Sequence, residues 1–151
     1  MRYIFFVLLL LPFILGCGND NPQGRVPIRG EVTFDGKPLE QGEILFSSLP
    51  DSTPVVATGS PVKNGTFSIP AKQGLIPDQT YLVQFSSIVE NQNAAPELQA
   101  LQKRNKKIDI SKFNTRNIIP PHYGVASKET VKAIKKSPNV FQFDLTSNAK
   151  E

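Results

Sequence analysis

The chain has 151 residues with one histidine and one cysteine, so few side chains are available for chemistry. His122 lies beside Tyr123, and Ser127 follows five positions later, which raises the hypotheses of a histidine base or metal ligand and of a serine nucleophile. A catalytic triad or metal centre needs several convergent partners, and no spacing in the sequence supplies them. We interpret His122 as a loop histidine and Ser127 as a helix N-cap, and predict no catalytic residue.

Acidic side chains are the second candidates for chemistry. Glu31, Asp35 and Glu43 could gather as a calcium site, but no loop has the dense Asp and Asn spacing of a calcium-binding loop. The single cysteine excludes an intrachain disulfide and a zinc site built on several cysteines. The sequence therefore predicts no metal ion and no cofactor, and we expect no enzymatic activity.

Cys17, the only cysteine, follows an apolar leader. Residues 1–16 carry Arg2 as their one charge and are otherwise almost wholly apolar, which is the plan of a secretory signal peptide. The apolar run is shorter than the about 20 residues that a membrane-spanning helix needs. The leader ends in ILGC at residues 14–17, which resembles a bacterial lipobox, where the cysteine is lipidated and becomes the new N-terminus. The alternative is an ordinary signal peptide with a cysteine near its end by chance.

A lipidated Cys17 would attach the chain to the extracytoplasmic side of a bacterial membrane, because two or more acyl chains anchor stably. Gly18 is not acidic, and by resemblance to the sorting rule of enteric bacteria this favours the outer membrane over the inner. Residues 17–27 are rich in Gly, Asn and Pro, which predicts a flexible tether. The predicted domain then covers residues 28–147, followed by a tail at 148–151.

After the tether, apolar and polar residues alternate with a period of two, which is typical of half-buried strands. The pattern predicts strands at 28–34, 43–47, 55–62, 66–70, 80–88 and 140–145. Asp35-Gly36 and Asn64-Gly65 favour two-residue type I′ hairpins, and the second turn places Lys63 opposite Thr66. Six to seven short strands separated by Gly, Pro and Asn turns predict an all-β fold, a single antiparallel β-sandwich.

Two segments break this pattern and predict one or two short peripheral helices. Residues 95–107 contain good helix formers within an insertion at 89–117, which predicts a short surface helix or, as the alternative, a partly ordered insertion. Residues 127–136 begin with a serine at the N-cap position and carry lysines toward their end, which suits a helix dipole. Ser137-Pro138 would end this second helix.

Tyr81 follows a Pro-Asp turn at the start of a predicted strand. A tyrosine in this position can pack into the core and hydrogen-bond back to the turn backbone, as the tyrosine corner of sandwich folds does. We therefore predict a structural role for Tyr81.

Positive charge is concentrated late in the chain. Residues 103–136 hold ten basic and two acidic residues, whereas residues 17–102 hold five basic and nine acidic ones. Near a lipid anchor, such a segment favours an anionic membrane surface or cell-wall polymer. Nucleic acid is not an expected partner, since the chain is exported and lacks interleaved aromatics. The alternative is a solvated face balanced by the acidic half. The candidate polyanion contacts are Lys103, Arg104, Lys106, Lys107, Lys132, Lys135 and Lys136.

The run GEVTFDGKPL at residues 30–39, followed by GEILF at 42–46, resembles the opening of small lipoproteins common in planctomycetes. Further matches follow in order at residues 64–67, 74–83, 119–123 with Ser127, and 139–145. These proteins resemble carboxypeptidase regulatory-like and transthyretin-like sandwiches, which implies an Ig-like or transthyretin-like fold without catalysis. The chain departs from the pattern at Asp78-Gln79, at residues 136–138 and in the insertion at 89–117.

Together these features predict a membrane-anchored extracytoplasmic lipoprotein with a binding or structural role in the cell envelope. Its partners would be membrane lipid through Cys17 and an envelope protein or anionic polymer. One alternative is a carrier for a small lipid or carbohydrate, which needs a large apolar cavity and is disfavoured by a filled core. Another is a transthyretin-like hydrolase, but the several His and Arg residues and the C-terminal tetrapeptide of such enzymes are absent.

Overall fold

The computed structural model describes residues 21, 23–90, 94–104, 115–136 and 138–148. The predicted leader, Cys17, Lys106 and Lys107 lie outside this part of the chain. The described residues form strands β1 (Ile28–Phe34), β2 (Lys37–Pro38), β3 (Gln41–Ser48), β4 (Ala57–Lys63), β5 (Thr66–Ile69), β6 (Thr80–Ser86), β7 (Ile88–Glu90), β8 (Thr115–Asn117), β9 (Thr130–Lys132) and β10 (Asn139–Leu145). They also form the helices η1 (Ala71–Gln73), a single 3-10 turn, and α1 (Ala94–Arg104).

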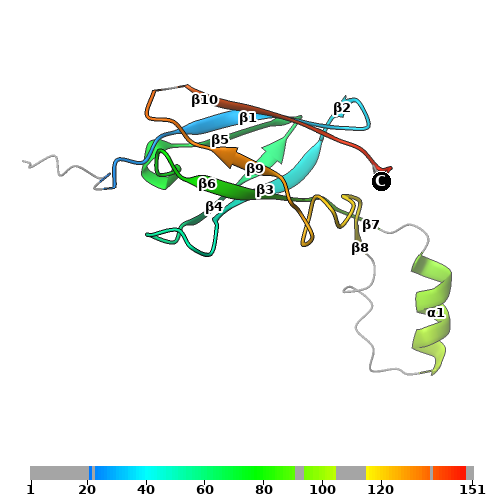
Figure 1. The fold of residues 1–151 in the computed structure, drawn as a ribbon. Helices are drawn as coiled ribbons and strands as arrows, with labels where there is room; N and C mark the ends of the chain where they lie inside the picture. Colours follow the sequence, from blue (N-terminus) through cyan, green and yellow to red (C-terminus); the bar gives the residue numbers. More distant parts are fainter. Residues whose placement is uncertain (1–20, 22, 91–93, 105–114, 137, 149–151) are drawn as a thin grey trace, which may run out of the picture.

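One curled sheet dominates the molecule, in the order β10-β1-β5-β4-β3-β6-β9, with β2 attached to β1. Its neighbouring strands are antiparallel except β1 and β10, which run parallel with Ile28 beside Asn139. The β4–β5 ladder contains only Lys63 and Thr66, and the sheet folds over there. One layer therefore holds β10, β1 and β5, and the other holds β4, β3, β6 and β9 (Figure 1). This is the all-β, sandwich-like fold that the sequence predicts.

Aromatic rings fill the space between the two layers. Phe46 of β3 lies 5.9 Å from Phe67 of β5, measured between ring centroids. Phe85 of β6 meets Phe143 of β10 edge-on at 5.0 Å. Such pairs contribute about 0.5–1.5 kcal/mol beyond the area that they bury. The period-two pattern is confirmed in β10, where Phe141, Phe143 and Leu145 face the core while the alternate residues are exposed.

Both predicted hairpin turns are confirmed. Asp35 and Gly36 have φ values of 50° and 75°, and Asn64 and Gly65 have 49° and 76°. A type I′ turn requires positive φ at both central residues, which Asn, Asp and Gly adopt at the least cost. Because each turn fixes its register, Lys63 pairs with Thr66 as the sequence predicts.

The predicted helix over residues 127–136 is wrong. Strand β9 lies within this segment and pairs with β6, with Leu82 beside Thr130 and Thr80 beside Lys132. Helix propensity and capping are weak local preferences, and the backbone pairing offered by the edge of β6 outweighs them here. The helix predicted over residues 95–107 is confirmed up to Arg104 as α1, and residues 105–107 lie outside the described part of the chain.

The chain joins the sandwich before the first strand. The Asn21 side chain donates to the Arg25 carbonyl oxygen at 2.7 Å and accepts from the Arg25 amide at 2.9 Å. Val26, which lies in the predicted tether, belongs to the core and exchanges two backbone hydrogen bonds with Leu75. The segment that could act as a free tether is therefore shorter than the sequence suggests.

Candidate functional site

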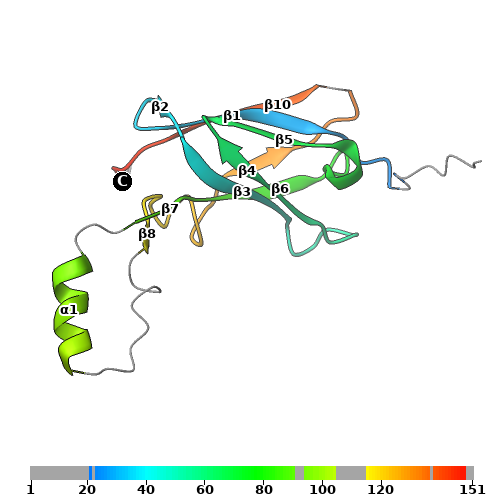
Figure 2. The same ribbon diagram turned by 180° about the vertical axis from the view of Figure 1, so that it is seen from behind.

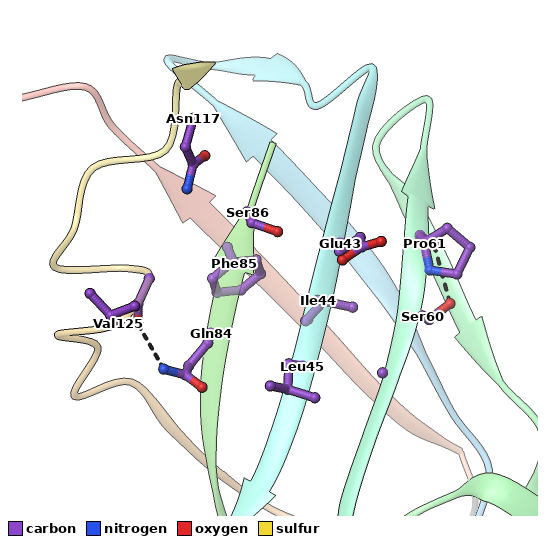
Figure 3. A pocket seen from close by; sticks show the side chains of 12 residues that line it. Glu43, Ile44, Leu45, Ser60, Pro61, Gln84, Phe85, Ser86, Asn117 and Val125 are labelled. Carbon is purple, nitrogen blue, oxygen red and sulfur yellow. Dashed lines mark hydrogen bonds between the residues drawn. The ribbon is translucent and has the colours of Figure 1, made fainter. Parts of the chain in front are cut away.

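A groove of about 500 Å³ lies on the outer face of the β4, β3 and β6 layer (Figure 3). Its floor forms because the register places Leu45 between Gly59 of β4 and Gln84 of β6. A Cβ on Gly59 would lie 2.9 Å from the Ile44 carbonyl oxygen and 3.6 Å from Leu45 Cδ1. The missing side chain at Gly59 therefore leaves Leu45 open to solvent, with 40% of its surface exposed.

The segment after β8 forms one wall of this groove. The Gln84 amide donates to the Gly124 carbonyl oxygen at 3.0 Å, which ties the wall to β6. Asn117 Oδ1 accepts from the Ser87 amide at 2.9 Å and fixes the start of the wall. Val125 stands at the rim with 91% of its surface exposed (Figure 3). Backbone hydrogen bonds from the Phe85 amide to the Tyr123 carbonyl oxygen and from the Ile118 amide to the Ser87 carbonyl oxygen add to these two contacts. The wall is thus held against β6 and presents an aliphatic side chain to the groove.

The groove offers hydroxyls, amides and aliphatic surface. Its polar side chains are Ser60, Gln84, Ser86 and Asn117, and Glu43 is the one charged residue among its described lining. A second hollow of about 640 Å³ continues the groove past Glu43, Pro61 and Ser86 to Ile88, which is 60% exposed. Exposed aliphatic groups beside hydrogen-bonding side chains are suited to an extended partner. The carboxylate disfavours a polyanion at this place.

Tyr81 forms the predicted corner. Its side chain is fully buried, and its hydroxyl accepts a hydrogen bond from the Ile76 amide at 2.9 Å. The same hydroxyl lies 3.3 Å from the Ile76 carbonyl oxygen and 3.1 Å from Gln79 Oε1, so it can donate to either. Burial raises the pKa of this hydroxyl above its ordinary value. Tyr81 is a structural residue that fixes the turn before β6.

His122, Ser127 and Asp35, which were considered for catalysis or metal binding, make contacts that hold the fold together. His122 is half-buried, and its ring lies 4.1 Å from that of Tyr123. The buried Ser127 hydroxyl donates to the Val83 carbonyl oxygen and accepts from the Glu129 amide, so it joins the loop before β9 to β6 instead of capping a helix. Asp35 accepts a hydrogen bond from the Ser147 amide at 2.7 Å. In the described ranges, no three His, Cys, Asp or Glu residues gather as a metal site.

The predicted polyanion contacts do not form one surface. Lys103 and Arg104 are exposed in the last turn of α1, which lies beyond one end of the sandwich (Figure 1). Lys132, Lys135 and Lys136 are exposed at the end of β9 and in the segment before β10, at the opposite end of the sandwich. Figure 2 shows from behind that α1 and the connection between β9 and β10 lie at opposite ends of the sandwich.

No family model, curated protein or solved structure matches the chain. Within the described ranges, none of the helices has the length and apolar character that crossing a membrane requires. A functional proposal for this chain therefore rests on its sequence motifs, its fold and the groove.

Proposed function

We propose that the protein is a lipid-anchored, extracytoplasmic binding module of the bacterial cell envelope without catalytic activity. Acylated Cys17 would hold it on the membrane, with the outer membrane favoured, and the groove on the outer face of β3, β4 and β6 would hold an envelope partner. The observation that carries the binding role is the exposure of Leu45 and Val125 beside a set of polar side chains. The lipobox-like ILGC at residues 14–17 supports the anchor.

The structure favours an exterior binding site over an interior one. A carrier for a lipid or carbohydrate would need apolar space between the two layers. Phe46, Phe67, Phe85 and Phe143 occupy that space with ring centroids 5.0–6.2 Å apart in successive contacts. The groove, by contrast, is open along the surface and continues into the neighbouring hollow beside Ile88. We therefore propose an extended protein segment or a neutral polymer as the partner.

The fold also agrees with the family resemblance of the sequence. We infer that the chain is a small lipoprotein of the planctomycete type with an Ig-like or transthyretin-like sandwich. The quoted motifs supply structural features of this fold, such as the Asn64-Gly65 hairpin and the Tyr81 corner. These features support the inferred fold class, and they do not identify the partner that the groove binds.

The anchor is tested by Cys17→Ala in the full chain. We expect this variant to accumulate as an unlipidated precursor, whose mass shows the retained residues 1–16 and no acyl chains. The native protein should lack residues 1–16 and partition into the detergent phase of Triton X-114, because acyl chains contribute about 0.8 kcal/mol per buried CH₂. A variant that partitions with detergent and has the same mature mass as the native protein would exclude lipidation at Cys17.

The groove is tested by photo-crosslinking in cells. A photoreactive amino acid replaces Val125 at the rim, and the matched control replaces Val55, an exposed valine in the connection between β3 and β4. We expect one discrete product from position 125 that Leu45→Lys abolishes by placing a charge on the apolar floor, while position 55 gives none. Equal products from both positions, or a product at position 125 that Leu45→Lys leaves unchanged in a variant with native thermal stability, would refute binding in the groove.

A further inference from the structure

The end of the sandwich where the chain enters, here called the tether end, is defined by its pairings. Ile28 at the start of β1 lies beside Asn139 at the start of β10 and Ile69 at the end of β5. In the other layer, Thr80 at the start of β6 pairs with Lys132 at the end of β9. The Tyr81 hydroxyl joins this layer to the turn at Ile76. The η1 turn and the β9–β10 connection therefore lie at the same end as the start of β1 (Figure 1).

Basic side chains gather at the tether end. The basic residues that this end carries in the described ranges are Arg25, Arg29, Lys72, Lys132, Lys135 and Lys136. All of them are exposed except Arg25, which is half-buried. The acidic residues at the same end of the described chain are Asp51 and Asp78. The opposite end carries the acidic residues Asp35, Glu40 and Asp144 close to its turns together with the basic residues Lys37 and Lys63, so the excess of positive charge on the sandwich lies at the tether end.

The anchor would hold the tether end against the membrane. Asn21 is fixed to Arg25 by two hydrogen bonds, so four residue steps separate the proposed anchor Cys17 from the folded domain. Four residues span at most about 14 Å when fully extended. This maximum exceeds the Debye length of about 8–10 Å at physiological ionic strength only when the four residues are nearly fully extended, so any shorter tether conformation brings the basic end within the field of charged headgroups.

We propose that the tether end is a docking surface for anionic lipid headgroups, and that docking orients the sandwich with the Ile88 end of its groove away from the membrane. This inference rests on the lipid anchor of the proposed function. A basic residue near an anionic leaflet favours the docked state by about fivefold. The exposed Lys132, Lys135 and Lys136 alone would favour docking by about 100-fold. These three are among the lysines that the sequence predicts as polyanion contacts, and the polyanion proposed for them is the lipid headgroup.

The orientation is measured on the full lipidated protein in vesicles. Because acylation consumes the only native thiol, a new cysteine can be labelled uniquely with a fluorophore. Gln73→Cys places the label in η1 at the tether end, and Asn148→Cys places it beyond the end of β10 at the other. In vesicles with 30 mol% phosphatidylglycerol and a lipid-bound quencher, we expect strong quenching at position 73 and little at position 148. Equal quenching at both positions would refute a fixed orientation.

Charge is tested by two matched triple variants of the labelled protein. The test variant replaces Lys132, Lys135 and Lys136 by Gln, and the control replaces Lys37, Lys63 and Lys128, which are exposed elsewhere on the sandwich. We expect the test variant to lower the ratio of docked to undocked protein about 100-fold and the control to leave it nearly unchanged. The same loss is expected for the unaltered lysines in vesicles of phosphatidylcholine alone or at 1 M salt. Equal effects of the two triple variants would overturn the proposal.

Flotation separates this proposal from the anchor on which it rests. If the protein fails to float with vesicles of either composition, the lipid anchor is wrong and orientation is no longer a property of this protein. If it floats with both compositions but its quenching responds to neither charge nor salt, the anchor stands and the docking surface is refuted.

Discussion

Replacing Tyr81 by Phe removes one oxygen atom from the buried corner at the start of β6. The side chain is fully buried, and its hydroxyl accepts from the Ile76 amide at 2.9 Å. It also lies within donating distance of Gln79 Oε1 and the Ile76 carbonyl oxygen. The ring itself keeps its shape in the variant, so the change reports on the hydrogen bonds of the corner.

The size of the effect follows from which partners lose their bonds. A buried donor left without a partner costs about 1–3 kcal/mol. Ile76 is half-buried, so water can reach part of the vacated site, and we expect a loss near the middle of this range, about 2 kcal/mol. For a chain of this size, such a loss lowers Tm by about 6–10 °C.

Thermal unfolding followed by circular dichroism measures this loss, and urea titration gives the free energy of unfolding. The matched control is Tyr123→Phe, since Tyr123 is half-buried against His122 and its hydroxyl makes no hydrogen bond with the described residues. We expect the control to change stability by less than about 0.5 kcal/mol. Equal losses in the two variants, or no loss in Tyr81→Phe, would refute the account of the corner.

Two further predictions concern the same framework. Because burial raises the Tyr81 pKa above its ordinary value of about 10, the folded state holds this proton more tightly than the unfolded state does. The stability that the hydroxyl provides is therefore complete below pH 10 and is lost as the pH rises through the folded-state pKa. Urea titrations should show a smaller difference in the free energy of unfolding between the native protein and Tyr81→Phe at pH 11 than at pH 8. An equal difference at the two pH values would contradict this. Gly30→Ala would place a Cβ 2.7 Å from the Phe67 ring and against the Phe141 carbonyl, and we expect about 3 kcal/mol of destabilisation by urea titration. The control Gly124→Ala should be nearly neutral, because its Cβ would have its nearest neighbour at 3.5 Å. Similar losses of stability in Gly30→Ala and Gly124→Ala would show that close packing at Gly30 is not the cause.

Local sequence patterns predicted most of the strands because their causes are local. Alternation over residues 28–34 follows from one buried and one exposed face, and Asn64-Gly65 adopts the positive φ values that its turn requires. The segment around Thr130 shows where such patterns fail, because its pairing with Leu82 comes from β6, almost 50 residues away. The parallel pairing of β1 with β10 is likewise invisible locally, since it joins the two ends of the domain.

The groove left almost no signal in the sequence. Leu45, Gly59 and Gln84 are ordinary outward-facing strand residues, and only the β3–β4 and β3–β6 registers bring them side by side. The basic tether end has the same origin, because Arg25 and Lys136 are far apart in the chain and come to one end through the sheet topology. The sequence shows a basic segment at residues 103–136, and the fold separates its α1 part from its β9 part.

The central claim, a lipid-anchored envelope protein, is tested most directly by the mass of the N-terminal peptide of the protein purified from membranes. Our account predicts that this peptide begins at Cys17 and carries a diacylglyceryl modification on the cysteine sulfur. A peptide that begins at any other residue, or one that begins at Cys17 with an unmodified thiol, would contradict it.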